Sequence, residues 1–158
     1  MSRYPLPLTR IVHDNLSVLM TFCFSRGPLE RLIEKMFVDE WKRLKNGLFE
    51  VSEERAKKAC FELALFLRTL DDEEQLSNVP RETWSTPHFG VLRQEGESDK
   101  PLKLGDVANK IIRAPELSWD FSPEERPLLI CRSRKQDEWT SAQIDIVGLA
   151  DFCSRLMH

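Results

Sequence analysis

The sequence predicts a mainly α-helical protein with a small β element (α+β class), in which a helical bundle carries a C-terminal antiparallel hairpin and a final helix. Two long stretches repeat apolar residues every three or four positions, which is the helical period. After Pro127 the period changes to two, which is typical of strands. A length of 158 residues with 41% hydrophobic and 31% charged residues indicates one globular domain over residues 1–158.

The N-terminal residues suggest an arm followed by a helix. Prolines alternate with other residues in Tyr4-Pro5-Leu6-Pro7-Leu8, which predicts an extended arm over residues 1–8. Residues 9–24 fit two periods. A helical face is formed by Val12, Leu16, Leu19, Met20 and Cys23; a strand-like alternation by Leu16, Val18, Met20, Phe22 and Phe24. We predict a helix, because Thr9 can cap it and the neighbouring segments are helical.

Residues 25–47 carry the strongest helical pattern of the chain. Pro28 suits the first position of a helix, and Gly47 suits a left-handed C-terminal cap. The apolar stripe between them contains Leu29, Leu32, Ile33, Met36, Phe37, Trp41 and Leu44. A stripe of this width is usually core. Any part of it that other elements leave uncovered is a candidate interface, represented by Met36, Phe37 and Trp41.

A second helix is predicted from Ser52, as N-cap, to Leu70, with Asp71 to Glu74 in a following turn because acids are unfavourable at a helix C-terminus. Residues 78–100 contain several prolines and glycines and predict a long loop with a short strand at 89–92. Loops of this length often bind something, so a small-molecule pocket between the loop and the bundle is one hypothesis.

The last third of the chain combines a helix, a hairpin and a helix. Pro101 is expected to open the third helix and Pro115 to end it. Residues 127–146 predict the antiparallel hairpin, for which the strand at 89–92 is the available third partner. The final helix is expected over 147–156, and Trp119 and Trp139 are expected to dock the hairpin on the bundle, each indole N–H with an acceptor.

Charge and cysteine usage indicate an intracellular protein. The net charge of −3 gives no global attraction to nucleic acid or to anionic membranes. Four widely separated cysteines in apolar contexts, Cys23, Cys60, Cys131 and Cys153, are expected to be reduced and buried in a cytoplasmic protein, with one disulfide pair as the alternative. The apolar run at 16–24 is too short to span a membrane.

No motif marks a catalytic, metal or cofactor site, so we predict no catalytic residue, no metal ligand and no cofactor. A basic cluster is a candidate contact for nucleic acid or phosphate, with Trp119 and Trp139 available for stacking; it consists of Lys110, Arg113, Arg132, Arg134 and Lys135. A charged, solvated hairpin turn is the simpler interpretation of the same residues, since Asp137 and Glu138 offset their charge.

The segment Asn109-Lys110-Ile111-Ile112-Arg113-Ala114 resembles one in small uncharacterised bacterial helical proteins, where His usually stands in place of Arg113 and Trp-Asp and a hairpin follow. Those proteins are similar in style to HEPN domains, helical bundles that include RNA-cleaving toxins and defence proteins acting through an Arg and a His on one helix. Arg113 cannot act as general acid or base, because it does not titrate near neutral pH. Arg81 and His88 have a suitable spacing but no helical pattern.

Two functions therefore follow from the sequence as hypotheses. The first is a non-enzymatic intracellular interaction protein, with self-association as a homodimer as one form of it. The alternative is an HEPN-like RNA-binding or RNA-cleaving protein of a bacterial defence or toxin system. The abundance of apolar positions and the scarcity of catalytic groups favour the first.

Overall fold

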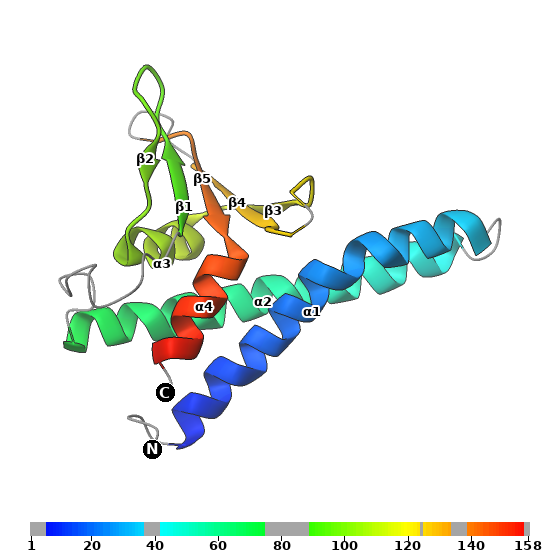
Figure 1. Cartoon of the computed structure of the whole chain (residues 1–158), viewed down its shortest axis with the longest axis horizontal. Coiled ribbons are helices and arrows are strands. Elements are labelled where there is room, and N and C mark those ends of the chain that lie inside the picture. Colours follow the sequence, from blue (N-terminus) through cyan, green and yellow to red (C-terminus); the bar gives the residue numbers. More distant parts are fainter. Residues whose placement is uncertain (1–5, 37–41, 75–88, 124, 134–138, 157–158) are drawn as a thin grey trace.

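The computed structural model describes residues 6–36, 42–74, 89–123, 125–133 and 139–156. It confirms the α+β class with four helices and a five-stranded sheet in this part of the chain (Figure 1). The elements are α1 (Leu6–Met36), α2 (Lys42–Glu74), β1 (Gly90–Arg93), β2 (Lys100–Pro101), α3 (Leu104–Arg113), β3 (Leu117–Asp120), β4 (Leu128–Arg132), β5 (Ser141–Asp145) and α4 (Ile146–Leu156).

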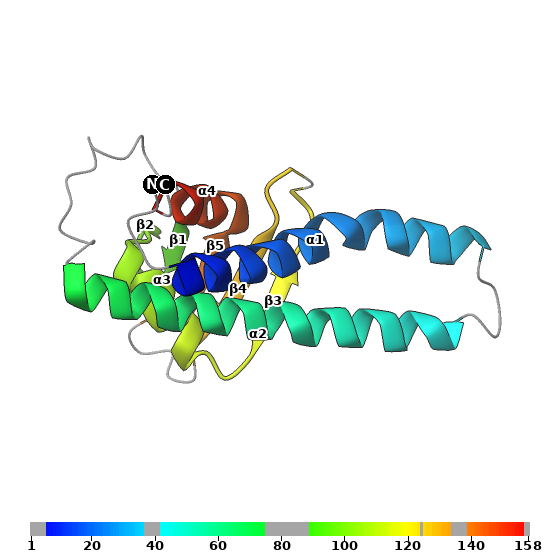
Figure 2. The same cartoon turned by 90° about the horizontal axis from the view of Figure 1, so that it is seen from below.

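Helices α1 and α2 are antiparallel; they lie side by side towards the end of α1 and the start of α2 and diverge towards the start of α1 (Figures 1 and 2). Each packs along a seven-residue repeat, the pattern of helices that wind around each other. On α2 the repeat is fully buried and consists of Phe49, Ala56, Leu63 and Leu70. On α1 it consists of Val12, Leu19 and Ile33, which are buried, and Arg26, whose guanidinium lies on the ring of Phe49.

The helical interpretation of residues 9–24 is confirmed, but the predicted boundaries around them are wrong. Residues 6–8 are helical instead of extended, since Pro7 lies in the first turn, where its missing N–H has no helical partner to lose. Pro28 does not begin a helix; α1 runs through it to Met36. A proline inside a helix costs about 3 kcal/mol, and burial of Phe22 before it and Ile33 after it offsets that loss.

The predicted helix over 25–47 is therefore divided between two helices. Gly47 is not a C-terminal cap and Ser52 is not an N-cap, because both lie inside α2. The Ser52 hydroxyl donates to the carbonyl of Phe49 within the helix, at 3.2 Å. The end predicted at Leu70 is also wrong, since α2 continues through the acidic residues to Glu74.

The second half of the predicted loop at 78–100 is a β-hairpin. Residues 78–88 lie outside the described part, but β1 and β2 pair through Val91 with Pro101 and Leu92 with Lys100. Pro101 therefore belongs to a strand and does not open α3. That helix begins at Leu104, where the backbone N–H of Lys103 donates to the Asp106 carboxylate at 3.2 Å.

The predicted hairpin at 127–146 is confirmed as β4 and β5, at the centre of a larger antiparallel sheet of order β2-β1-β5-β4-β3. The predicted third strand is also confirmed, since β1 pairs with β5. Helix α3 connects the two edge strands, β2 and β3. It passes between the sheet and α2 (Figure 1).

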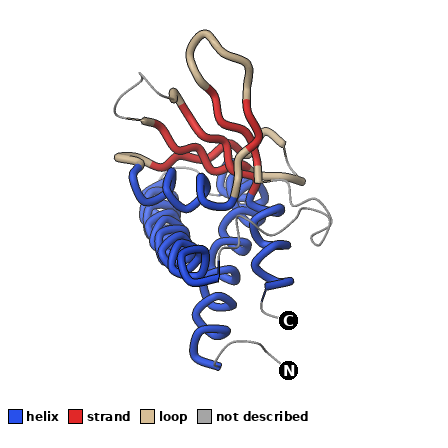
Figure 3. Tube along the Cα trace, turned by 90° about the vertical axis from the view of Figure 1, so that its left-hand side faces the viewer, coloured by secondary structure: helices blue, strands red, loops and turns tan. Residues whose placement is uncertain are grey.

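The helices all lie on one side of the sheet, so the molecule has a helical layer and a sheet layer with an open outer face (Figure 3). Alternate strand residues enter the core between the layers, among them Leu129, Cys131, Ala142 and Ile144. The final helix α4 follows β5 directly and lies against α1. Its predicted inward residues Leu149, Phe152 and Cys153 are buried.

The segment around Trp119 is an edge strand, which the sequence did not predict. Trp119 does dock the sheet on a helix, because its ring meets Phe22 of α1 edge to face, 4.9 Å between centroids. Its indole N–H is buried without a hydrogen-bond partner in the described part of the chain, so the expected acceptor is not there.

Candidate functional site

The far ends of α1 and α2 project beyond the sheet as a helical arm, which we define as residues 27–36 and 42–52 (Figures 1 and 2). The main core includes α1 residues up to Cys23 and α2 residues from Ala56, so the arm lies outside it. Among arm residues with described side chains, Ile33 and Phe49 are the buried large apolar residues. The exposed ones are Leu29, Leu32, Met36, Leu48 and Val51.

This balance is unusual for a water-facing helix pair, because the arm exposes more large apolar side chains than it buries. Met36 is 68% exposed, Leu48 54% and Val51 49%. Large apolar groups gathered on one exposed element usually mark a surface that another molecule covers. The arm carries five of the ten exposed large apolar side chains in the described part of the chain.

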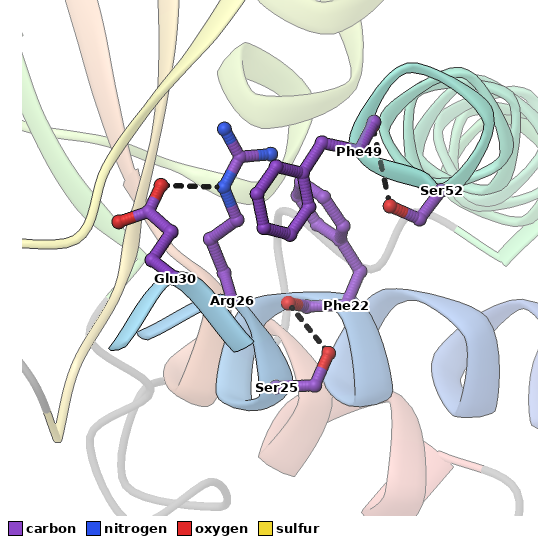
Figure 4. A network of polar contacts seen from close by, with 6 residues as sticks. All are labelled: Phe22, Ser25, Arg26, Glu30, Phe49 and Ser52. Atoms are coloured by element: carbon purple, nitrogen blue, oxygen red, sulfur yellow. Dashed lines mark hydrogen bonds and ion pairs between the residues drawn. The ribbon is translucent and has the colours of Figure 1, made fainter. Parts of the chain in front are cut away.

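Arg26 holds the root of the arm together (Figure 4). Its Nε donates to Glu30 Oε1 at 2.9 Å, and its guanidinium carbon lies 4.0 Å from the centroid of the Phe49 ring. The Arg26 side chain is 21% exposed, so the ion pair and the cation–π contact are partly shielded from water. Because these contacts span the turn that contains Pro28 and reach across to α2, they support both helices where the arm begins.

Of the predicted interface residues, Met36 lies at the end of α1 and is exposed, while Phe37 and Trp41 lie outside the described residues. The prediction assigned Leu29 and Leu32 to the core and did not consider Leu48 or Val51 as surface. The signal that was missed is periodic: Ile11, Val18 and Leu32 share one seven-residue repeat, and reading Pro28 as a helix start divided it.

Of the basic residues predicted to bind nucleic acid, the three that the structure describes do not share one surface. Lys110 lies on the helical side of the sheet, with its ammonium 4.2 Å from the centroid of the Trp139 ring. Arg113 is exposed at the end of α3, and Arg134 and Lys135 lie outside the described residues. Arg132 follows the buried Cys131 in β4 and therefore points to the opposite, outer face.

A different arginine joins Arg132 on the outer face. Ser141 of β5 is paired with Arg93 of β1 on one side and with Arg132 of β4 on the other. The three residues therefore form one row across three strands, with both arginines exposed. Arg93 also lies 3.7 Å from Asp99. The sequence did not indicate this row, because Arg93 stood in a segment predicted as loop.

The cysteine prediction is confirmed, since all four are free and buried. Burial raises the pKa of Cys23, Cys131 and Cys153 to about 12, and raises that of Cys60 well above its ordinary value. At neutral pH these thiols are protonated, which is the unreactive form. Across the described ranges, no three metal-ligating side chains are grouped to hold an ion, and no helix there has the length and apolarity to cross a membrane.

Arg81 and His88, and residues 78–88 of the hypothetical ligand pocket, lie outside the described part of the chain. Comparisons with protein-family models, with curated proteins and with solved structures found no match to this chain.

Proposed function

We propose that this chain is a non-enzymatic protein-interaction module whose docking surface is the helical arm. The observation that carries the proposal is the arm's composition: five exposed large apolar side chains against two buried ones, outside the main core. Folding gains little from exposed leucine and methionine, so their presence is better explained by binding. Four reduced thiols fit a reducing compartment, so we expect the module to act in the cytoplasm.

The experiment places a photo-reactive amino acid at Leu32 and irradiates extracts of cells that make the chain. The same group at Arg68, which is exposed on α2 outside the arm, is the control. We expect a discrete adduct from position 32 that is lost when Met36 is changed to Lys. Adducts that match those of the Arg68 control, or that survive Met36→Lys, would contradict the proposal.

RNA binding is the second candidate, and the row Arg93–Ser141–Arg132 favours it. Two exposed arginines on an open sheet face suit phosphate contacts, with half-buried Ile130 and Val91 beside them. A filter-binding titration with single-stranded RNA at low salt tests it. Charge reversal of Arg93 and Arg132 should weaken binding and reduce its salt dependence, whereas Arg68→Glu should not. Equal effects at all three positions would rule out this face.

A further inference from the structure

Helix α1 carries a second seven-residue repeat beside the one that packs on α2. It consists of Ile11, Val18, Ser25 and Leu32, each one residue before a member of the repeat that faces α2. Ile11, Val18 and Leu32 are exposed and Ser25 is half-buried. Because successive residues are about 100° apart around a helix, this exposed stripe faces away from α2 by roughly that angle.

An exposed repeat of this period has a physical meaning. On an isolated straight helix, residues seven apart drift by about 20° per repeat, so a long stripe would wind away from any partner. Because α1 follows a seven-residue repeat along α2, the adjacent repeat stays on one side of α1 and forms a seam that follows the bend of this helix (Figure 1). Leu29 and Met36 lie four residues after Ser25 and Leu32 and widen the seam within the arm. The seam suits one further helix.

We infer that the further helix is α1 of a second copy, paired in the antiparallel direction; this inference rests on the proposed function and names its partner. Antiparallel pairing places Ile11 opposite Met36 of the second copy and Val18 opposite Leu29. The apolar arm of each molecule then covers the exposed residues near the N-terminus of the other. One two-fold axis repeats every contact, as in most protein homodimers.

Charge decides the direction of pairing. Asp14 and Lys35 both lie at the edge of the seam, four residues before Val18 and three after Leu32. Within its own helix Asp14 pairs with Arg10, 3.2 Å from Arg10 Nε to Asp14 Oδ1, an exposed ion pair that a lysine of the second copy can join. In the antiparallel arrangement Asp14 lies beside Lys35 of the second copy, and two such opposite-charge pairs form. In a parallel arrangement the edges that carry Asp14 and Lys35 lie on opposite sides of the helix pair, so these opposite charges do not meet. Edge charges of this kind set the partner and orientation of helix pairs.

The first experiment measures the mass of the purified full-length chain by sedimentation over a wide concentration range. We expect a dimer with twice the 18.5 kDa of one chain. Val18→Lys should raise the dissociation constant at least about tenfold, because a charge replaces a buried apolar contact. Phe24→Lys is the matched control: Phe24 is 44% exposed and Val18 38%, both on α1, but Phe24 lies off the seam.

The second experiment tests the orientation by charge exchange. Asp14→Lys and Lys35→Asp should each raise the dissociation constant about threefold to tenfold, and the double variant should restore the original value. Both positions are exposed, and Asp14→Lys removes only the exposed ion pair with Arg10, so circular dichroism should show unchanged folding. A double variant that binds no better than either single variant would overturn the antiparallel pairing.

The outcomes separate this inference from the proposed function. A chain that stays monomeric from micromolar to millimolar concentration overturns the dimer, as do equal effects of Val18→Lys and Phe24→Lys. If the Leu32 adduct in extracts then still depends on Met36 and contains a different polypeptide, the arm is a docking surface for that protein and only the inference fails. If neither dimer nor adduct forms, both proposals fail.

Discussion

Asp145 joins the sheet to α4 with both oxygens of its carboxylate. It is the last residue of β5, only 3% exposed, and Oδ1 accepts the N–H of Gly148 in the first turn of α4 at 3.0 Å. Oδ2 accepts from Arg126 Nε and Nη2, both at 2.8 Å. One carboxylate therefore caps α4 and forms an ion pair with Arg126.

We expect Asp145→Ala to lower the free energy of unfolding by about 2–4 kcal/mol, since it removes a helix cap, leaves the buried N–H of Gly148 without its acceptor and removes the partner of Arg126. Urea unfolding measures this loss. Asp151→Ala is the control, because Asp151 also pairs with an arginine, Arg155 at 3.2 Å, but on the exposed side of α4. That substitution should change stability by less than about 1 kcal/mol. Similar losses for both variants would contradict the assigned role.

Cysteines from three elements meet in the core. The pKa of Cys60 on α2 is raised by burial first and then by the neighbouring thiols of Cys23 on α1 and Cys131 on β4. A thiol with a raised pKa in the folded state holds its proton more tightly than it does in the unfolded chain. For Cys131, whose pKa is raised to about 12, the contribution to stability is therefore complete below the ordinary thiol pKa of 9.0 and is lost as the pH rises from there to about 12; the pKa of Cys60 is raised in the same direction.

The free energy of unfolding should therefore fall above pH 9.0, by up to about 1.4 kcal/mol per pH unit for each buried thiol. Urea titrations at several pH values measure the slope. Cys153→Ala removes one thiol and should make the slope shallower by one thiol's share, although it also lowers stability at neutral pH by leaving a small cavity. An unchanged slope would show that Cys153 ionises without unfolding.

At the scale of elements, the prediction and the structure differ at Gly47, which is predicted to cap a helix but lies inside α2. A glycine in a helix interior is less stable than alanine by about 0.5–1 kcal/mol, and no atom lies within 4 Å of a Cβ built there. Gly47→Ala should therefore raise the free energy of unfolding by about that amount. A left-handed cap at Gly47 would instead be destabilised by alanine, so a loss of stability would contradict the continuous α2.

Gly90→Ala provides the opposite result in the same measurement. Gly90 has a φ of 118°, and a Cβ there would overlap the backbone oxygen of Gln143 in the neighbouring strand. Alanine would have to push β1 away from β5, so we expect a loss of more than about 2 kcal/mol. The two glycines together distinguish a helix interior from a close approach of strands.

The elements show what the sequence could predict and why the rest was missed. The period-two pattern predicts β4 and β5, and the apolar period of residues 104–112 predicts α3, because burial on one face determines both patterns. The boundaries at Pro28, Gly47 and Ser52 were misplaced because these are local signals, whereas contacts between α1 and α2 decide where the helices run. Strands β2 and β3 are short edge strands, each paired only with its neighbour in sequence, and two or four residues are too few to show a period.

The candidate site was missed for the same reason. Met36 was predicted, but the exposed stripe of α1 becomes visible only when residues 11–36 are read as one helix. Dividing that helix at Pro28 assigned Leu29 and Leu32 to the core of a separate bundle helix. The described members of the basic cluster lie on different sides of the sheet, Lys110 on the helical side and Arg132 on the outer face, because consecutive strand residues such as Cys131 and Arg132 point to opposite faces.

At the scale of the whole molecule, the structure combines a two-layer body with an arm that has little core of its own (Figures 1 and 2). In the arm only two of the large apolar side chains that the structure describes are buried, Ile33 and Phe49, and they contribute little stability to a projection of this length. If α1 of a second copy covers the arm, folding and association are coupled. Binding then adds to the stability of the folded state according to protein concentration.

The melting temperature should therefore rise with protein concentration. For simple ligand binding, a concentration of about a hundred times the dissociation constant stabilises the folded state by about 2.7 kcal/mol, and dimerisation follows the same dependence on mass action. Scanning calorimetry over a wide concentration range measures the shift. Phe24→Lys should keep the rise and Val18→Lys should abolish it, since only Val18 lies on the seam. A melting temperature independent of concentration in the unaltered chain would mean that the arm is stable without a second copy and that its apolar surface binds a different partner.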